Sequence, residues 1–112
     1  MDLDFCMCGS DGYAVALQHS GSNHHPRSFG SAAKFMRKLL DANCAPGAAV
    51  KRMTALPAEF FRLPQLGIIR PGYTADITVF DPETIDSKAD FVNPNLPADG
   101  ILMTVLNGNI TG

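Results

Sequence analysis

Residues 67–85 read GIIRPGYTADITVFDPETI, and this stretch decides how the C-terminal half of the chain folds. Pro71 followed by Gly72 suits the central positions of a type II turn, because proline presets the first φ angle and glycine accepts the positive second one. Residues 75–80 then largely alternate apolar and polar side chains, which is typical of a strand, and an Asp-Pro pair ends the run. The stretch therefore predicts a turn that leads into an antiparallel strand.

A second strand is predicted downstream, at residues 101–106, which read ILMTVL. Asn107-Gly108 follows it and is a strong signal for a two-residue hairpin turn. Only four residues come after this pair, so the return strand is expected to be short. Residues 86–100, between the two strands, contain two prolines and a glycine and are expected to be irregular.

Three helices are predicted upstream of the Pro-Gly turn. Ser31 is a suitable N-cap for the first, at residues 32–42. A Pro-Gly pair opens a second at residues 46–53, and a proline at the first helical position opens a third at residues 57–62. The first helix is amphipathic, with Phe35, Met36, Leu39 and Leu40 on one face and Lys34, Arg37, Lys38 and Asp41 on the other.

The N-terminal residues carry the candidate chemistry. Residues 3–8 read as a buried strand, and Asp11 lies in the Gly-Ser-Asp-Gly turn directly after it. A carboxylate at the carboxyl end of such a strand is a candidate general base or metal ligand, and a plain Asx turn or helix cap is the alternative. On the long loop that follows, Arg27 could bind a carboxylate through two hydrogen bonds. The adjacent His24 and His25 point in different directions and cannot easily share one metal.

Composition excludes several classes of protein. The chain has 112 residues with 9 basic and 11 acidic side chains, a net charge of −2, and 46% hydrophobic residues. It is therefore globular rather than disordered, and it is neither a dedicated nucleic-acid binder nor a membrane-spanning protein. Eight of the bases lie in residues 27–70, whereas residues 71–112 are acidic. We expect the basic block to be the solvated face of helices and the acidic block to lie in turns.

The cysteines predict a reducing compartment. Cys6, Cys8 and Cys44 are an odd number, and the first two are too close to form a disulfide comfortably, so a cytoplasmic location fits best. A zinc site made of these three and a histidine is conceivable, but the spacing of the first two is shorter than structural zinc sites use. Small apolar core residues are the simpler interpretation.

The predicted elements are lopsided. The first strand has no parallel neighbour, although parallel strands are buried on both faces, and the last hairpin stops at its turn. We therefore expect the chain to be a fragment, or to complete a larger structure, and its cut edges allow it to associate with itself.

Six segments together resemble a known family. They are CGSDG (8–12), HHPRSFG (24–30), KRMTALPAEFFRL (51–63), GIIRPGYTADITVFDPETI (67–85), ADFVNPNLPADGI (89–101) and the closing VLNG (105–108), in this order and with compatible spacing. The series is similar to the C-terminal part of the N-acyl-D-amino-acid deacylases, or D-aminoacylases, of the metal-dependent amidohydrolase superfamily. The HPRSFG and ADFxNPxxPxxGI segments are more particular to this group than the RPGYxADxxVFDP stretch is.

The resemblance implies an α/β fold that is the C-terminal fragment of a (β/α)8 TIM barrel with part of a composite β-sandwich. Residues 1–63 would be the last βα portion of the barrel, with an active-site loop at 9–30, and residues 64–112 would belong to the sandwich. A barrel alone needs about 250 residues, which would explain the cut edges.

The resemblance also implies the chemistry, which is zinc-dependent hydrolysis of an N-acyl-D-amino acid. Asp11 would be the general base that activates a metal-bound water, Arg27 would bind the substrate α-carboxylate, and His25 would shape the same loop. Zinc would be bound mainly by residues of a missing N-terminal part, with Asp11 the one candidate ligand here. The chain alone should then be inactive. Hydrolysis of cyclic amides, as in hydantoinases and dihydroorotases, and a non-catalytic interaction module remain the alternatives.

Overall fold

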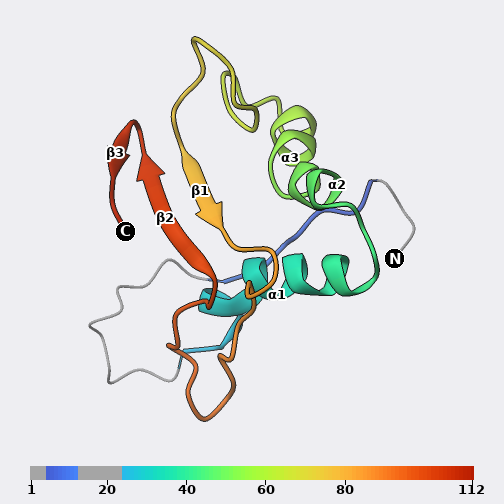
Figure 1. Cartoon of the computed structure of the whole chain (residues 1–112), viewed down its shortest axis with the longest axis vertical. Coiled ribbons are helices and arrows are strands. Elements are labelled where there is room, and N and C mark those ends of the chain that lie inside the picture. The colour runs from blue at the N-terminus through green and yellow to red at the C-terminus, as the bar shows by residue number, and fades with distance from the viewer. Residues whose placement is uncertain (1–4, 13–23) are drawn as a thin grey trace.

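The computed structural model describes residues 5–12 and 24–112, which form helices and one small antiparallel sheet (Figure 1). The elements are α1 (Arg27–Asp41), α2 (Pro46–Lys51), α3 (Ala55–Phe60), β1 (Ile77–Phe80), β2 (Ile101–Leu106) and β3 (Asn109–Ile110). In Figure 1 the sheet stands above one end of α1, and the two short helices stand above the other end. Among the described residues, no helix is long and apolar enough to cross a membrane.

Helix α1 is the longest element, and it begins earlier than the sequence predicts. Pro26 is its N-cap, and the Ser31 hydroxyl donates to the carbonyl oxygen of Arg27 at 2.9 Å. Ser31 is therefore an interior residue of the first turns, and its prediction as the N-cap is wrong. The amphipathic prediction is confirmed, because Met36 and Leu39 are buried in the core together with Ile85 from the C-terminal half.

Helix α2 has six residues, two fewer than the predicted range 46–53, and helix α3 has six residues as predicted but lies two residues earlier in the chain. Helix α2 begins at Pro46 as predicted and ends at Lys51. Helix α3 begins at Ala55, two residues before the predicted start at Pro57, and ends at Phe60. The proline is still tolerated, because it lies in the first turn, where backbone N–H groups have no partner within the helix.

The sheet has the order β1-β2-β3, with both pairs antiparallel. Ile77 lies opposite Val105, and the register shifts after Val79. The hairpin turn between β2 and β3 forms as predicted, because Asn107 and Gly108 both have positive φ angles, 49° and 81°. The prediction of both strands and of a short return strand is confirmed.

The Pro-Gly turn before β1 also forms. Gly72 has a φ angle of 86°, and the Tyr73 N–H donates to the Arg70 carbonyl oxygen at 3.1 Å, as a type II turn requires.

The predicted first strand does not form where the structure describes it. Residues 3 and 4 lie outside the described residues, and residues 5–8 adopt no regular secondary structure. A strand needs a neighbour for its backbone hydrogen bonds, and no described strand lies beside this segment. It is held against α1 instead, where the Cys8 thiol lies 3.9 Å from the Ser31 carbonyl oxygen.

The start of α1 packs closely against the segment that follows β1. Gly30 is buried, and a Cβ atom at this position would overlap the Ser87 hydroxyl and lie 3.1 Å from the Ser87 Cβ. Ser87 is itself buried, and its hydroxyl accepts the Ala89 N–H at 3.2 Å. The contact therefore requires glycine, and it joins two parts of the chain that are far apart in sequence.

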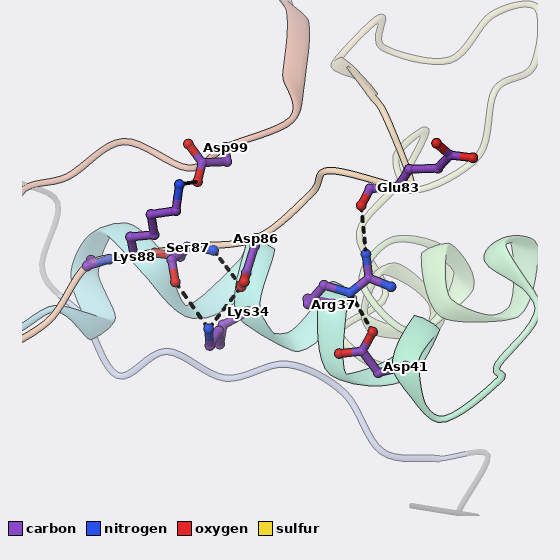
Figure 2. Close-up of polar contacts among 9 residues, drawn as sticks. Lys34, Arg37, Asp41, Glu83, Asp86, Ser87, Lys88 and Asp99 are labelled. Atoms are coloured by element: carbon purple, nitrogen blue, oxygen red, sulfur yellow. Dashed lines mark hydrogen bonds and ion pairs between the residues drawn. The ribbon is translucent and has the colours of Figure 1, made fainter.

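Charged residues reinforce this contact, as Figure 2 shows. Lys34 Nζ lies 3.0 Å from Asp86 Oδ1, and Arg37 Nη1 donates to the Pro82 carbonyl oxygen at 3.0 Å. Arg37 Nε also pairs with Asp41 at 2.8 Å. The polar face of α1 was predicted to be simply solvated, but two of its bases bind the acidic block. This pairing between two distant segments of the chain could not be predicted from the sequence of either segment alone.

Replacing Gly30 with alanine should destabilise the protein. The added methyl group meets Ser87 in a buried contact, and overpacking of this kind costs about 1–3 kcal/mol. Gly47→Ala is the matched control, because Gly47 is also helical but its added methyl group meets nothing within 4 Å. Both variants gain helix propensity, so the difference between them isolates the contact. Urea denaturation measures it, and equal midpoints for the two variants would contradict the packing argument.

The ion pair of Asp86 with Lys34 should make the free energy of unfolding fall at acidic pH. The hydrogen bonds from Lys34 and from the Ser87 N–H lower the pKa of Asp86. A lowered pKa in the folded state gives stability that is present above the unfolded pKa of about 3.9 and is lost as the pH falls below it. The urea midpoint should therefore drop less between pH 5 and pH 3 in Asp86→Asn than in the wild type. Glu59→Gln, which removes an exposed carboxylate on α3, should keep the wild-type profile. These pH values are about one unit either side of that unfolded pKa.

Candidate functional site

The turn that carries Asp11 rests directly on α1. A Cβ atom on Gly12 would lie only 2.9 Å from the Ser28 Cα, so the backbone approaches the first turn of the helix as closely as glycine permits. The Gly12 N–H donates to the Ser10 hydroxyl at 3.2 Å. Asp11 has a φ angle of 49°, in the left-handed region that aspartate tolerates better than most residues. Serine thus closes the turn, and the aspartate carboxylate projects from it.

The structure brings Asp11 and Arg27 together. Asp11 Oδ2 lies 3.4 Å from Arg27 Nη2, and the Asp11 side chain is 91% exposed. The two residues come from the two motifs that the sequence analysis singled out, 16 positions apart. The exposed carboxylate and the guanidinium therefore form one polar pair at the start of α1, open to a ligand from solvent.

His25 supports the backbone of this pair rather than facing Asp11. Its Nδ1 accepts the Arg27 N–H at 3.1 Å, so neutral His25 carries its proton on Nε2. The ring also stacks edge-to-face against Phe91, with 5.0 Å between ring centroids and 76° between the planes. Phe91 lies in the ADFVNP motif, yet sequence reasoning gave it no role. No local sequence pattern predicts that the Phe91 ring packs against the His25 ring.

A polar groove of about 500 Å³ continues from Arg27 along α1 to residues 86–89. Its three cations each have a carboxylate partner: Arg27 pairs with Asp11, Lys34 with Asp86, and Lys88 with Asp99 at 3.0 Å. The hydrogen bond to that aspartate raises the pKa of Lys88. An anion entering this groove would compete with carboxylates already in place. The pairs of Arg27 with Asp11 and of Lys88 with Asp99 are the two that are most open to solvent, because Asp11 is 91% exposed in the first and Lys88 is 77% exposed in the second.

The described residues do not form a zinc site by themselves. Among residues 5–12 and 24–112, no three His, Cys, Asp or Glu side chains come together as metal ligands. The zinc site considered from Cys6, Cys8 and Cys44 is therefore not formed. Burial raises the pKa of the Cys8 thiol, which favours the uncharged form over the thiolate that binds metals. Asp11 alone would give a metal one ligand.

A larger, mostly apolar groove of about 720 Å³ lies between α1, the segment 66–78 and the sheet. Met36, Met53, Phe80 and Ile101 are among its lining side chains. Asp76 also reaches it, but the Asp76 carboxylate accepts the Asn107 N–H at 2.7 Å and so fixes the hairpin turn. Asp11, His25 and Arg27 do not line this groove, so it is separate from the polar pair.

Comparison with known proteins places this arrangement in a family. The model of the amidohydrolase family matches residues 3–111, nearly the whole chain. The chain belongs to the amidohydrolase family. The resemblance that the motifs carry is thereby confirmed, and with it the α/β class, since helices and strands both occur and the solved structures that the chain resembles are amidohydrolases.

Individual amidohydrolases match over most of this chain. It is 37% identical to an N-acyl-D-glutamate deacylase and 38% identical to a D-aminoacylase, both of Alcaligenes xylosoxydans xylosoxydans, over 92% and 91% of its length. The chain spans only 20% of either relative. The crystal structure of N-acyl-D-glutamate deacylase from Bordetella bronchiseptica, complexed with zinc and a phosphonate inhibitor, superposes with a TM-score of 0.80 at 37% identity. That match covers 94% of this chain and 22% of the deacylase.

If Asp11 serves chemistry rather than the fold, its removal should leave this amidohydrolase chain as stable as before. The side chain is exposed, and surface ion pairs contribute about 0–1 kcal/mol. Asp11→Asn should therefore change the free energy of unfolding by no more than about 0.5 kcal/mol. Asp86→Asn, which breaks the ion pair between α1 and residue 86, is the comparison and should cost more. A larger loss in Asp11→Asn than in Asp86→Asn, measured by urea denaturation, would show a structural role for Asp11.

Proposed function

We propose that this chain is the part of a zinc-dependent N-acyl-D-amino-acid deacylase that supplies the general base and a substrate-binding arginine. The observation that carries the proposal is the pairing of Asp11 with Arg27, at 3.4 Å, in a chain 37% identical to a deacylase of this kind. One residue can accept a proton and the other can bind an anion. An N-acyl-D-amino acid presents both requirements, an amide to hydrolyse and a free α-carboxylate to hold.

Asp11 is suited to the proton transfers of amide hydrolysis. A carboxylate within hydrogen-bond reach of a water molecule accepts its proton as the water oxygen attacks the amide carbon. The same carboxyl group then donates that proton to the nitrogen of the leaving amine, so the carboxylate is restored and the C–N bond breaks. Asp11 lies on a tight turn with its side chain 91% exposed, and the Ser10 hydroxyl accepts the hydrogen bond that closes the turn.

Arg27 is suited to bind the α-carboxylate. The contact with Asp11 uses one terminal nitrogen, Nη2, and a guanidinium carries five N–H donors in a planar fork. A substrate carboxylate can therefore form two parallel hydrogen bonds with this fork. Binding at Arg27 would also place the neighbouring amide bond close to Asp11. His25, which holds the Arg27 N–H, acts on the shape of the loop.

The relatives are about five times longer than this chain, and we propose that the remaining parts of the enzyme lie in a correspondingly longer protein. We propose that residues 1–63 belong to the end of a (β/α)8 barrel, with the loop 9–30 at its active site, and that residues 64–112 belong to a β-sandwich. Residues 13–23 of that loop lie outside the described residues. The residues that the structure describes do not form a zinc site by themselves, and we propose that the zinc of this enzyme takes most of its ligands from the part of the protein that precedes this chain.

The full-length protein that contains this sequence should hydrolyse N-acetyl-D-amino acids. Asp11→Asn should lower kcat by about 10²- to 10⁴-fold, the usual contribution of a general base. Arg27→Gln should raise KM by about 10- to 100-fold, because hydrogen bonds between charged groups are worth about 1.5–3 kcal/mol. Arg27→Lys keeps the charge without the fork, and it should recover only part of the loss. Steady-state kinetics of amine release measures these effects.

A substrate panel separates the competing functions. Open N-acyl-D-amino acids, a hydantoin and dihydroorotate should be tested side by side, and activity confined to the cyclic amides would exclude the deacylase. The 112-residue chain alone should show no activity on any of them. Full activity of the chain alone, abolished by Asp11→Asn, would contradict the proposed division of the site.

A further inference from the structure

We propose that Phe91 is a positioning residue for the candidate site, which fixes the His25 ring and through it the backbone of Arg27. Its relevance to catalysis rests on the proposed function, but the contact itself is independent of any activity. The inference assigns a role to an exposed aromatic residue from a distant segment of the chain.

The geometry links three residues in series. The rings of Phe91 and His25 meet edge-to-face at 5.0 Å, which is a favoured arrangement for aromatic pairs. The second side-chain torsion of histidine is broad, so the ring needs a neighbour to hold one orientation. In the orientation that Phe91 allows, His25 Nδ1 points at the Arg27 N–H and accepts it at 3.1 Å. The bond satisfies a donor at the first residue of α1, where the helix itself provides no acceptor.

The segment that carries Phe91 is built to hold it in place. Asp90 Oδ1 accepts the backbone N–H groups of Val92 and Asn93, at 2.9 and 2.6 Å. On the N-terminal side of Phe91, the Ser87 hydroxyl accepts the Ala89 N–H. Phe91 is nevertheless 80% exposed, so its ring buries little area and adds little to the core. A turn held by three hydrogen bonds presents a largely exposed phenylalanine to one histidine, and a role in holding that histidine explains this arrangement better than core packing does.

The effect of Phe91 on the Arg27 backbone extends to Asp11, because Arg27 and Asp11 form an ion pair. A small change of the backbone at Arg27 is amplified along its long side chain, and the guanidinium then moves relative to Asp11 Oδ2, which lies 3.4 Å away. Phe91 thus connects the segment after β1 to the polar pair through His25.

The test is NMR spectroscopy of the 112-residue chain with three variants at the turn. Phe91→Leu removes the ring and keeps an apolar side chain, Phe91→Tyr keeps the ring, and Val92→Ala is the matched control at the next exposed position. In the wild type we expect nuclear Overhauser contacts between the His25 and Phe91 rings. In Phe91→Leu the Arg27 amide should exchange about two- to tenfold faster with water, the range expected from losing one aromatic pair. The Arg27 Hε resonance should shift with it.

The controls separate positioning from general stability. Phe91→Tyr and Val92→Ala should keep the wild-type exchange rate and Arg27 Hε resonance. In a His25→Ala background, Phe91→Leu should have no further effect on Arg27, because the link that transmits it is already gone. The inference is overturned if ring contacts are absent in the wild type, if Phe91→Leu leaves Arg27 unchanged, or if its effect persists without His25. None of these readouts needs enzymatic activity, so failure of the deacylase assay is a separate result.

Discussion

The close approach of α1 to Ser87 is the contact on which the rest of the fold depends. Gly30 allows the helix to touch this residue, and the ion pair between Lys34 and Asp86 holds the same junction from the solvent side. Ile85, two residues before Ser87, is buried against the apolar face of α1. This one junction therefore joins the helices to the strands. The described residues include few deeply buried large side chains, and the loss of this junction would leave two small units, each with too little apolar burial to be stable alone.

The candidate site inherits its geometry from the same junction. Its arginine is the first residue of α1, and the turn that carries Asp11 rests on the second, Ser28. The segment that leaves Ser87 goes on to place Phe91 against His25. Residues from three separate motifs therefore meet at one helix N-terminus, although the motif that carries Phe91 is far from the other two in sequence.

Local chemistry was predictable from the sequence, whereas relations between distant segments were not. Asn107-Gly108 and Pro71-Gly72 dictate their turns through their own backbone preferences, and both turns form. The start of α1 was predicted five residues too late, because Ser31 is a good N-cap by type and yet donates to a carbonyl within the helix. The pairing of Asp11 with Arg27 was suggested only as separate roles in two motifs, and the part played by Phe91 depends on tertiary packing that no periodicity encodes.

The left-handed backbone at Asp11 restricts which residues can occupy that position, whatever their chemistry. Asparagine and glycine hold a φ angle of 49° at little cost, whereas valine and isoleucine do so only under strain. The turn thus acts as a filter on sequence variation, since it admits short polar side chains and rejects branched apolar ones before any selection for proton transfer. A carboxylate at this position is one of the few side chains that satisfies the backbone and the proposed reaction together.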